Sequence, residues 1–77
     1  MTAAKKARVK LKLGQRVKVG PPQAYWPDGV IVRLRTDGRV WVQLDMRPPG
    51  LHWDFPANDD RANWKVFDRD QLSEAAR

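Results

Sequence analysis

Residues 25–44 read YWPDGVIVRLRTDGRVWVQL, and this stretch decides the fold. It contains two Asp-Gly pairs, Asp28-Gly29 and Asp37-Gly38, each followed by an alternating apolar segment. Asp and Gly are turn residues, because Asp bonds its own backbone and Gly accepts left-handed conformations. The segments 30–35 and 39–45 are therefore predicted to be two antiparallel strands of one hairpin.

The length of the loop sets the register of this hairpin. A two-residue loop would place the aliphatic face of one strand against the polar face of the other. A three-residue loop, 36–38, pairs Leu34 with Val40 and Val32 with Val42. Burial favours the second register, because a slip of one residue moves every side chain to the other face. The predicted core face consists of Val30, Val32, Leu34, Val40, Val42 and Leu44.

The opposite face of the hairpin is basic and aromatic. The favoured register places Arg33 opposite Trp41, where a cation–π contact is possible. It also makes Arg35 and Arg39 direct neighbours, and like charges directly opposite each other destabilise a sheet. This pair favours an anionic partner over a merely solvated face.

The remaining alternating segments complete an all-β architecture. Residues 9–19 alternate around Gly14, which predicts a first strand with a bend or bulge at that glycine. Two further strands are expected at residues 51–55 and 64–67, followed by a helical turn at 68–72 that returns Leu72 to the core. Five short strands with turns about every ten residues indicate a small closed or nearly closed barrel.

The 77 residues are enough for one domain with one small core. We expect a disordered basic tail at 1–8, a barrel at 9–73 and a C-terminal tail at 74–77. The chain has no cysteine, which excludes disulfides and thiolate metal sites. It has no apolar run near the roughly 20 residues of a membrane span and no signal-peptide core, so the predicted location is cytoplasmic.

The formal net charge of +6 is unevenly distributed. Residues 1–20 carry seven bases and no acid, whereas residues 51–77 carry four bases and six acids. This asymmetry favours a polyanionic partner for the N-terminal half, with a solubilising tail as the alternative.

No catalytic constellation is evident in the sequence. The single histidine, His52, is expected to be a surface residue on a sheet face. The carboxylate pairs Asp59-Asp60 and Asp68-x-Asp70 fit turn capping better than cation binding or acid–base chemistry. We therefore expect no enzyme activity, no cofactor and no metal.

The chain contains, in order, Gly14-Gln15-Arg16-Val17-Lys18-Val19, Trp26-Pro27-Asp28-Gly29-Val30-Ile31, Asp37-Gly38-Arg39-Val40-Trp41-Val42-Gln43-Leu44-Asp45, and finally Val66 and Leu72. This order resembles SH3-like barrels of the Tudor type over residues 13–72. The resemblance implies an SH3-like fold, which hosts many functions.

Tudor domains that read methylated side chains use an aromatic cage, and Trp26 matches one cage position. The aromatic residue usual after the glycine is replaced by Val30, and only Trp53 or Phe55 could complete the cage in space. Reading of a methyl mark is therefore a minor alternative.

Two more distant resemblances concern other short SH3-like chains. Residues 64–67, Trp-Lys-Val-Phe, stand where type B dihydrofolate reductase has Val-Gln-Ile-Tyr, so the substrate-binding groups of that family are missing. The Gly-x-x-Val-x-Val and Tyr-Trp segments are similar to those of the SH3-like photosystem I subunit, which implies a non-catalytic docking role.

The basic and aromatic residues on the outward side of the strands are the main functional signal. They are Lys10, Lys12, Arg16, Lys18, Arg33, Arg35, Arg39 and Trp41. Cations neutralise phosphates while aromatic rings stack on bases. We expect them to form one contiguous face that binds DNA or RNA with weak sequence specificity, the alternative being a polar sheet face that prevents aggregation.

A protein-docking module is the rival hypothesis. The candidate aromatic partner site consists of Tyr25, Trp26, Trp53 and Phe55, with Tyr25, Trp26 and Trp53 expected to be exposed on loops that also carry prolines. Arg and Trp are frequent hot-spot residues at protein interfaces. The chain is expected to be a monomer or an edge-strand dimer.

Overall fold

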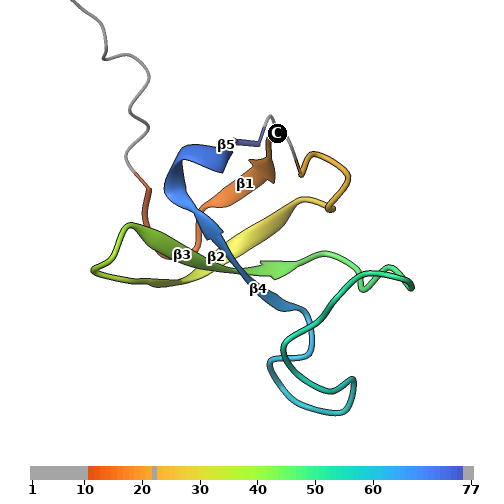
Figure 1. Ribbon diagram of the computed structural model, residues 1–77. Coiled ribbons are helices and arrows are strands. Elements are labelled where there is room, and N and C mark those ends of the chain that lie inside the picture. Colours follow the sequence, from red (N-terminus) through yellow and green to blue (C-terminus); the bar gives the residue numbers. More distant parts are fainter. Residues whose placement is uncertain (1–10, 22, 76–77) are drawn as a thin grey trace, which may run out of the picture.

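A computed structural model describes residues 11–21 and 23–75, and the described chain is all-β (Figure 1). Its strands are β1 (Arg16–Val19), β2 (Gly29–Leu34), β3 (Arg39–Leu44), β4 (Trp64–Asp68) and β5 (Leu72–Glu74). The five strands form one antiparallel sheet in the order β4-β3-β2-β1-β5. The predicted all-β fold with five short strands is confirmed.

The first strand is shorter than predicted. Gly14 adopts a φ of +83° in a turn, where the backbone N–H of Gln15 donates to the carbonyl of Lys12 over 3.2 Å. The chain therefore bends at Gly14, as expected, but residues 11–13 do not belong to the strand. Residues 9 and 10 of the predicted strand lie outside the described residues.

The hairpin register is as predicted next to the turn. Leu34 lies opposite Val40, and Arg33 lies opposite Trp41. Gly38 has a φ of +85°, the left-handed conformation that the three-residue loop requires.

Farther from the turn, a β-bulge between Ile31 and Arg33 changes the pairing. Val42 lies opposite Ile31 instead of the predicted Val32, because the bulge sets an extra β2 residue against β3. Ile31 is therefore 1% exposed, whereas Leu34 is 45% exposed. The predicted core face is wrong for β2, whose two buried residues are Gly29 and Ile31.

The predicted strand at residues 51–55 is also wrong. These residues form bends within a long loop between β3 and β4, visible at the lower right of Figure 1. Side chains satisfy part of this backbone: Arg47 donates to the carbonyls of Phe55 (2.9 Å) and Ala62, and the Trp53 indole N–H donates to the carbonyl of Pro48 (3.2 Å). The fifth strand is β5 instead, which follows a 3₁₀ turn, η2 (Arg69–Gln71), and pairs with β1.

One cluster of apolar side chains forms the core. Its members are Leu11, Val17, Val19, Trp26, Ile31, Val40, Val42, Leu44, Phe67 and Leu72. Leu72 is buried as predicted, while Leu51 and Trp53 pack against the cluster from the loop. Within residues 11–21 and 23–75, no helix is long and apolar enough to cross a membrane.

Candidate nucleic-acid interface

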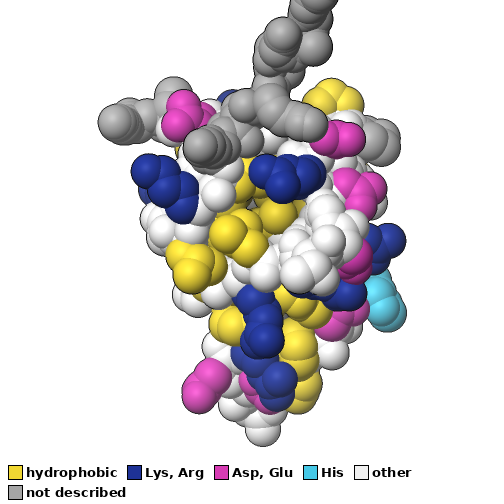
Figure 2. Space-filling view, turned by 90° about the vertical axis from the view of Figure 1, so that its left-hand side faces the viewer, with side chains coloured by type: hydrophobic (Ala, Val, Ile, Leu, Met, Phe, Trp, Pro, Cys, Tyr) yellow, Lys and Arg dark blue, Asp and Glu magenta, His cyan; other side chains and the backbone are white. Residues whose placement is uncertain are grey.

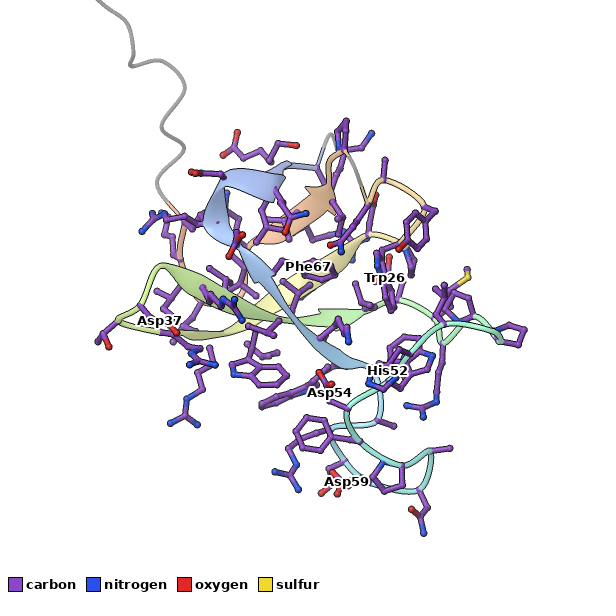
Figure 3. The ribbon with its side chains drawn as sticks, viewed as in Figure 1. Trp26, Asp37, His52, Asp54, Asp59 and Phe67 are labelled. Atoms are coloured by element: carbon purple, nitrogen blue, oxygen red, sulfur yellow. The ribbon has the colours of Figure 1, made fainter. Side chains whose placement is uncertain are left out.

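The tip of the β2–β3 hairpin carries an open groove of about 450 Å³. Its lining residues are Arg33, Leu34, Arg35, Thr36, Asp37 and Trp41. The hairpin projects away from the rest of the sheet, and Asp37 marks its tip (Figure 3). Three of the residues predicted for the basic face, Arg33, Arg35 and Trp41, are thus brought together in one concave feature. We call it the hairpin groove.

Trp41 is half-buried and supported by other aromatic rings. Its ring centroid lies 5.7 Å from that of Phe55 and 6.1 Å from that of Trp64. Phe55 is supplied by the β3–β4 loop, and the Arg61 guanidinium lies 4.3 Å from the Phe55 ring. Trp64 and Arg61 join this site although the sequence pattern did not indicate them. The one signal in the sequence is the alternation within residues 64–67. It places Trp64 and Phe67 on opposite faces of the strand, so a buried Phe67 leaves Trp64 on the outer face.

Acidic side chains accompany two arginines of the hairpin. Arg35 and Arg39 are backbone neighbours, joined by a 3.0 Å hydrogen bond. Their guanidinium groups, however, lie 2.7 Å from Asp37 and 3.4 Å from Asp68 respectively. The expected like-charge clash is therefore relieved within the molecule, and it no longer argues for an anionic partner by itself.

Arg33 differs from its neighbours in this respect. Among the residues that the structure describes, no ion pair involves Arg33, Lys12 or Lys18. The Arg33 guanidinium also makes none of the described cation–ring contacts, so the contact with Trp41 that the register makes possible is not present. Arg33 is therefore an exposed cation beside an aromatic ring, with its donors available to a ligand.

The bases near β1 form a separate group. Arg16 binds the Asp45 carboxylate through two hydrogen bonds of 3.1 and 2.5 Å, and this contact raises the pKa of Arg16 and lowers that of Asp45. Lys18 lies opposite Ser73 of β5, two strands away from Trp41. Lys10 lies outside the described residues.

Figure 2 views the molecule from the hairpin side. A column of Lys and Arg side chains lies directly beside hydrophobic ones in the lower half of this face, while other basic side chains lie higher up. White and yellow surface lies between this column and the bases nearest the top, whereas basic and acidic side chains flank the column on the right. The bases described on this face do not form the single contiguous patch expected from the sequence.

The predicted aromatic partner site is divided. Tyr25 is 63% exposed, but Trp26 is only 6% exposed because it packs edge-on against Phe67 and Trp53, with centroids 5.9 and 5.1 Å away. The prediction that Trp26 is an exposed loop anchor is therefore wrong. Phe55 belongs to the Trp41 cluster instead.

The corner beside Trp26 already holds a cation of the chain itself. The Lys65 ammonium lies 5.6 Å from the centroid of the Trp26 ring and 3.6 Å from the Asp54 carboxylate. A methyl-lysine cage requires an aromatic face that the ligand's cation can reach. The Trp26 ring is buried and already has the Lys65 ammonium nearby, so it does not provide such a face.

Asp59 caps a turn, and His52 lies on the surface. Asp59 accepts hydrogen bonds from the backbone and side chain of Arg61 at 2.7 and 3.0 Å, which lowers the pKa of Asp59. This is the turn capping expected from the sequence. His52 is exposed, and the described part of the chain contains no group of three His, Cys, Asp or Glu residues that could hold a metal ion.

Comparison with protein-family models, with curated proteins and with solved structures finds no match for this chain. The assignment of a function therefore depends on the geometry of the hairpin groove and its surroundings.

Proposed function

We propose that this protein is a small non-catalytic module that binds nucleic acid through the outer face of the β2–β3 hairpin. The observation that supports this most is the Arg33 guanidinium, which forms no ion pair within the described part of the chain and lies directly across the strand pair from a supported indole, Trp41. Guanidinium groups bind phosphate oxygens with two parallel hydrogen bonds, and aromatic rings stack on bases. The groove brings both chemistries within one concave feature.

The proposed binding has weak sequence specificity. Contacts to phosphates carry no direct sequence information, and every base presents a ring face for stacking. Within residues 11–21 and 23–75, the single helical element is the three-residue η2, which is too short to read a major groove. The hairpin groove therefore suits backbone contacts and stacking better than recognition of base edges.

The ion pairs of Arg35 and Arg39 do not prevent these residues from contributing. The side chains of both pairs are between 41 and 64% exposed, and ion pairs at exposed sites contribute little free energy. A phosphate can therefore compete with Asp37 or Asp68 for the guanidinium. The bases of residues 1–8 would add phosphate contacts that are independent of sequence.

The relationship to SH3-like barrels of the Tudor type is part of the same proposal. The sequence motifs quoted above support it, and a five-stranded antiparallel sheet with short strands is compatible with it. A cytoplasmic location and the absence of a cofactor stay predictions from the sequence.

Protein docking is the second candidate, and one surface favours it. Tyr25 and Met46 are 63 and 59% exposed on two loops that meet where the Asp45 N–H donates to the Asp28 carbonyl over 2.8 Å. Tyr25 also stacks on the buried Trp26, with ring centroids 6.0 Å apart. This contact restricts the conformations of the Tyr25 side chain. With Trp26 buried, however, this surface has fewer aromatic anchors than the sequence suggested.

Fluorescence anisotropy of labelled oligonucleotides tests the proposal at two salt concentrations. We expect micromolar or tighter binding that weakens as salt rises. Arg33→Gln should weaken binding about five- to tenfold, since it removes one charge-assisted hydrogen-bonding group for phosphate.

Arg16→Gln is the matched control, because it removes the same charge from β1, outside the residues that line the hairpin groove. Its effect should be clearly smaller than that of Arg33→Gln. Equal losses in both variants would mean that net charge, and not the hairpin groove, governs binding. Absence of binding at low salt would reject the proposed function and direct attention to the Tyr25–Met46 surface.

A further inference from the structure

We infer that the hairpin groove prefers single-stranded nucleic acid, with one unpaired base stacked on Trp41 and an adjacent phosphate on Arg33. This inference rests on the proposed function and specifies its ligand. Three features of the site support it: the shape of the groove, the support behind the indole and the pattern of ion pairs.

The groove is open and small. Its volume of about 450 Å³ lies toward the lower end of the range for pockets that hold small molecules, so it suits one nucleotide rather than a helix. In a duplex the ring faces of the bases are hidden in the stack, and only their edges face the grooves. An indole that lines such a groove can therefore stack only on a base that is unpaired or turned out of the helix.

The indole is held in place before any ligand arrives. Phe55 and Trp64 contact Trp41 at centroid distances of 5.7 and 6.1 Å, and both make tilted rather than parallel contacts, with interplanar angles of 47°. A side chain that is already packed loses little conformational entropy when a base stacks on it. This arrangement favours a role in stacking rather than simple filling of the sheet face.

The charges near the groove are too few for tight binding of a duplex by phosphate contacts alone. Within the described chain, a phosphate can bind Arg33 directly, whereas it must displace a carboxylate to bind Arg35 or Arg39. Proteins that rely on phosphate contacts use many such cations at once. Stacking must therefore supply a substantial part of the affinity.

Three labelled ligands of equal length test this inference with the full chain: a twelve-residue thymidine oligonucleotide, an abasic strand with the same phosphates, and the corresponding duplex. We expect the thymidine strand to bind about tenfold more tightly than the abasic strand, as one base stack provides. The duplex should also bind more weakly than the thymidine strand. Equal affinity for the thymidine and abasic strands, or tighter binding of the duplex, would overturn the inference while leaving the proposed function standing. Failure of all three ligands to bind would reject the proposed function itself.

A variant of Trp41 adds an internal control. Trp41→Leu should reduce the affinity for the thymidine strand to that for the abasic strand, and it should leave binding of the abasic strand unchanged. If Trp41→Leu does not fold, Trp41→Phe keeps a ring and should bind the thymidine strand with intermediate affinity. A thymidine-to-abasic ratio that is unchanged in a folded variant would show that stacking occurs elsewhere.

Discussion

At Gly29, strand β2 approaches β3 so closely that no other residue fits. A Cβ atom at this position would overlap the carbonyl oxygen of Gln43 and lie 2.6 Å from Cγ1 of Val42. The carbonyl oxygen of Gln43 is a backbone atom, so it cannot move aside by a change of rotamer as a flexible side chain could. Gly29 thus places β2 directly against β3, which is the pairing on which the hairpin groove is built.

Gly29→Ala should therefore destabilise the fold, by about 3 kcal/mol, at the upper end of typical overpacking costs. Urea unfolding followed by tryptophan fluorescence measures the effect. Gly50→Ala is the control, because Gly50 has a φ of +85° but open space around it, so only backbone strain of about 1 kcal/mol is expected. A neutral Gly29→Ala would contradict the packing described for β2 and β3.

The pair of Arg16 and Asp45 should make stability depend on pH. The contact lowers the pKa of Asp45 below its ordinary value of 3.8 in the folded state. Its stabilisation is therefore present above the unfolded-state pKa and is lost as pH falls through the lower folded-state pKa.

Asp45→Asn should consequently lower the melting temperature at pH 7. The difference in melting temperature between the variant and the unmodified protein should disappear as the pH approaches 2. Melting curves recorded by circular dichroism across this range measure the gap. Arg16→Gln should give the same profile, and the double variant should lose no more than either single one. A gap that is constant with pH would show that the ion pair does not act as described.

Several site residues could be predicted from the sequence and others could not, for a physical reason. Arg33 and Trp41 were correctly placed opposite each other because a tight turn of three residues sets their register locally. The acids that pair with Arg16 and Arg39 are 29 residues away in each case, at Asp45 and Asp68, and only the fold brings them close. Sequence spacing alone therefore overestimated the free charge of the basic face.

Among the elements, the loop between β3 and β4 forms the support of the groove. Its conformation depends on Arg47, whose guanidinium donates to the carbonyls of Phe55 and Ala62 and lies 4.7 Å from the Trp53 ring. These contacts hold Phe55 against Trp41. The alternation at residues 51–55 thus reflects side chains that pack from a loop, which is why it was mistaken for a strand.

Arg47→Met should loosen this loop without unfolding the sheet. Hydrogen exchange measured by mass spectrometry should show faster exchange across residues 53–62 and little change in β1 and β2. Affinity for nucleic acid should fall severalfold, because Trp41 loses part of its support. Lys18→Gln is the matched control, since it removes one positive charge from β1, two strands away from Trp41 and outside the loop. Unchanged exchange in Arg47→Met would contradict the role assigned to Arg47.

Strand β5 and the bulge in β2 show the limits of local pattern. β5 has only three residues, and its position depends on pairing with β1, where Val19 lies opposite Leu72. The bulge sets Ile31 rather than Val32 into the core, and all three residues 30–32 are β-branched and apolar. Their pattern therefore cannot show which face is buried.

In the whole molecule, the basic residues fall into two groups that would contribute differently to nucleic-acid binding. The sheet carries bases that are largely balanced by nearby acids, whereas residues 1–8 carry Lys5, Lys6 and Arg8 without any acid. These residues lie outside the described chain, and their proposed role follows from charge alone.

β4 and β5 are the two edges of the sheet, where a second copy of the chain could pair. The edge-strand dimer stays a prediction, and analytical ultracentrifugation would measure the oligomeric state.

Replacing Lys5, Lys6 and Arg8 by Gln should lower affinity for every oligonucleotide by a similar factor. The slope of log K against log salt should become shallower by about 0.7 for each phosphate of a single strand that the variant no longer neutralises. The melting temperature should not change. A variant with Arg and Lys exchanged at the same positions keeps the charge and should bind like the unmodified protein. A large change in the preference for thymidine over abasic strands would contradict this division of roles.

The most direct measurement is a titration of the ¹⁵N-labelled full chain with the twelve-residue thymidine oligonucleotide, followed by two-dimensional NMR. If the hairpin groove is the nucleic-acid site, the largest shift changes will occur at the backbone amides of Arg33 to Asp37 and at the indole N–H of Trp41, with smaller changes along β1. Shift changes concentrated around Tyr25 and Met46, or confined to β1 and β5, would place the interface elsewhere and contradict the proposed site.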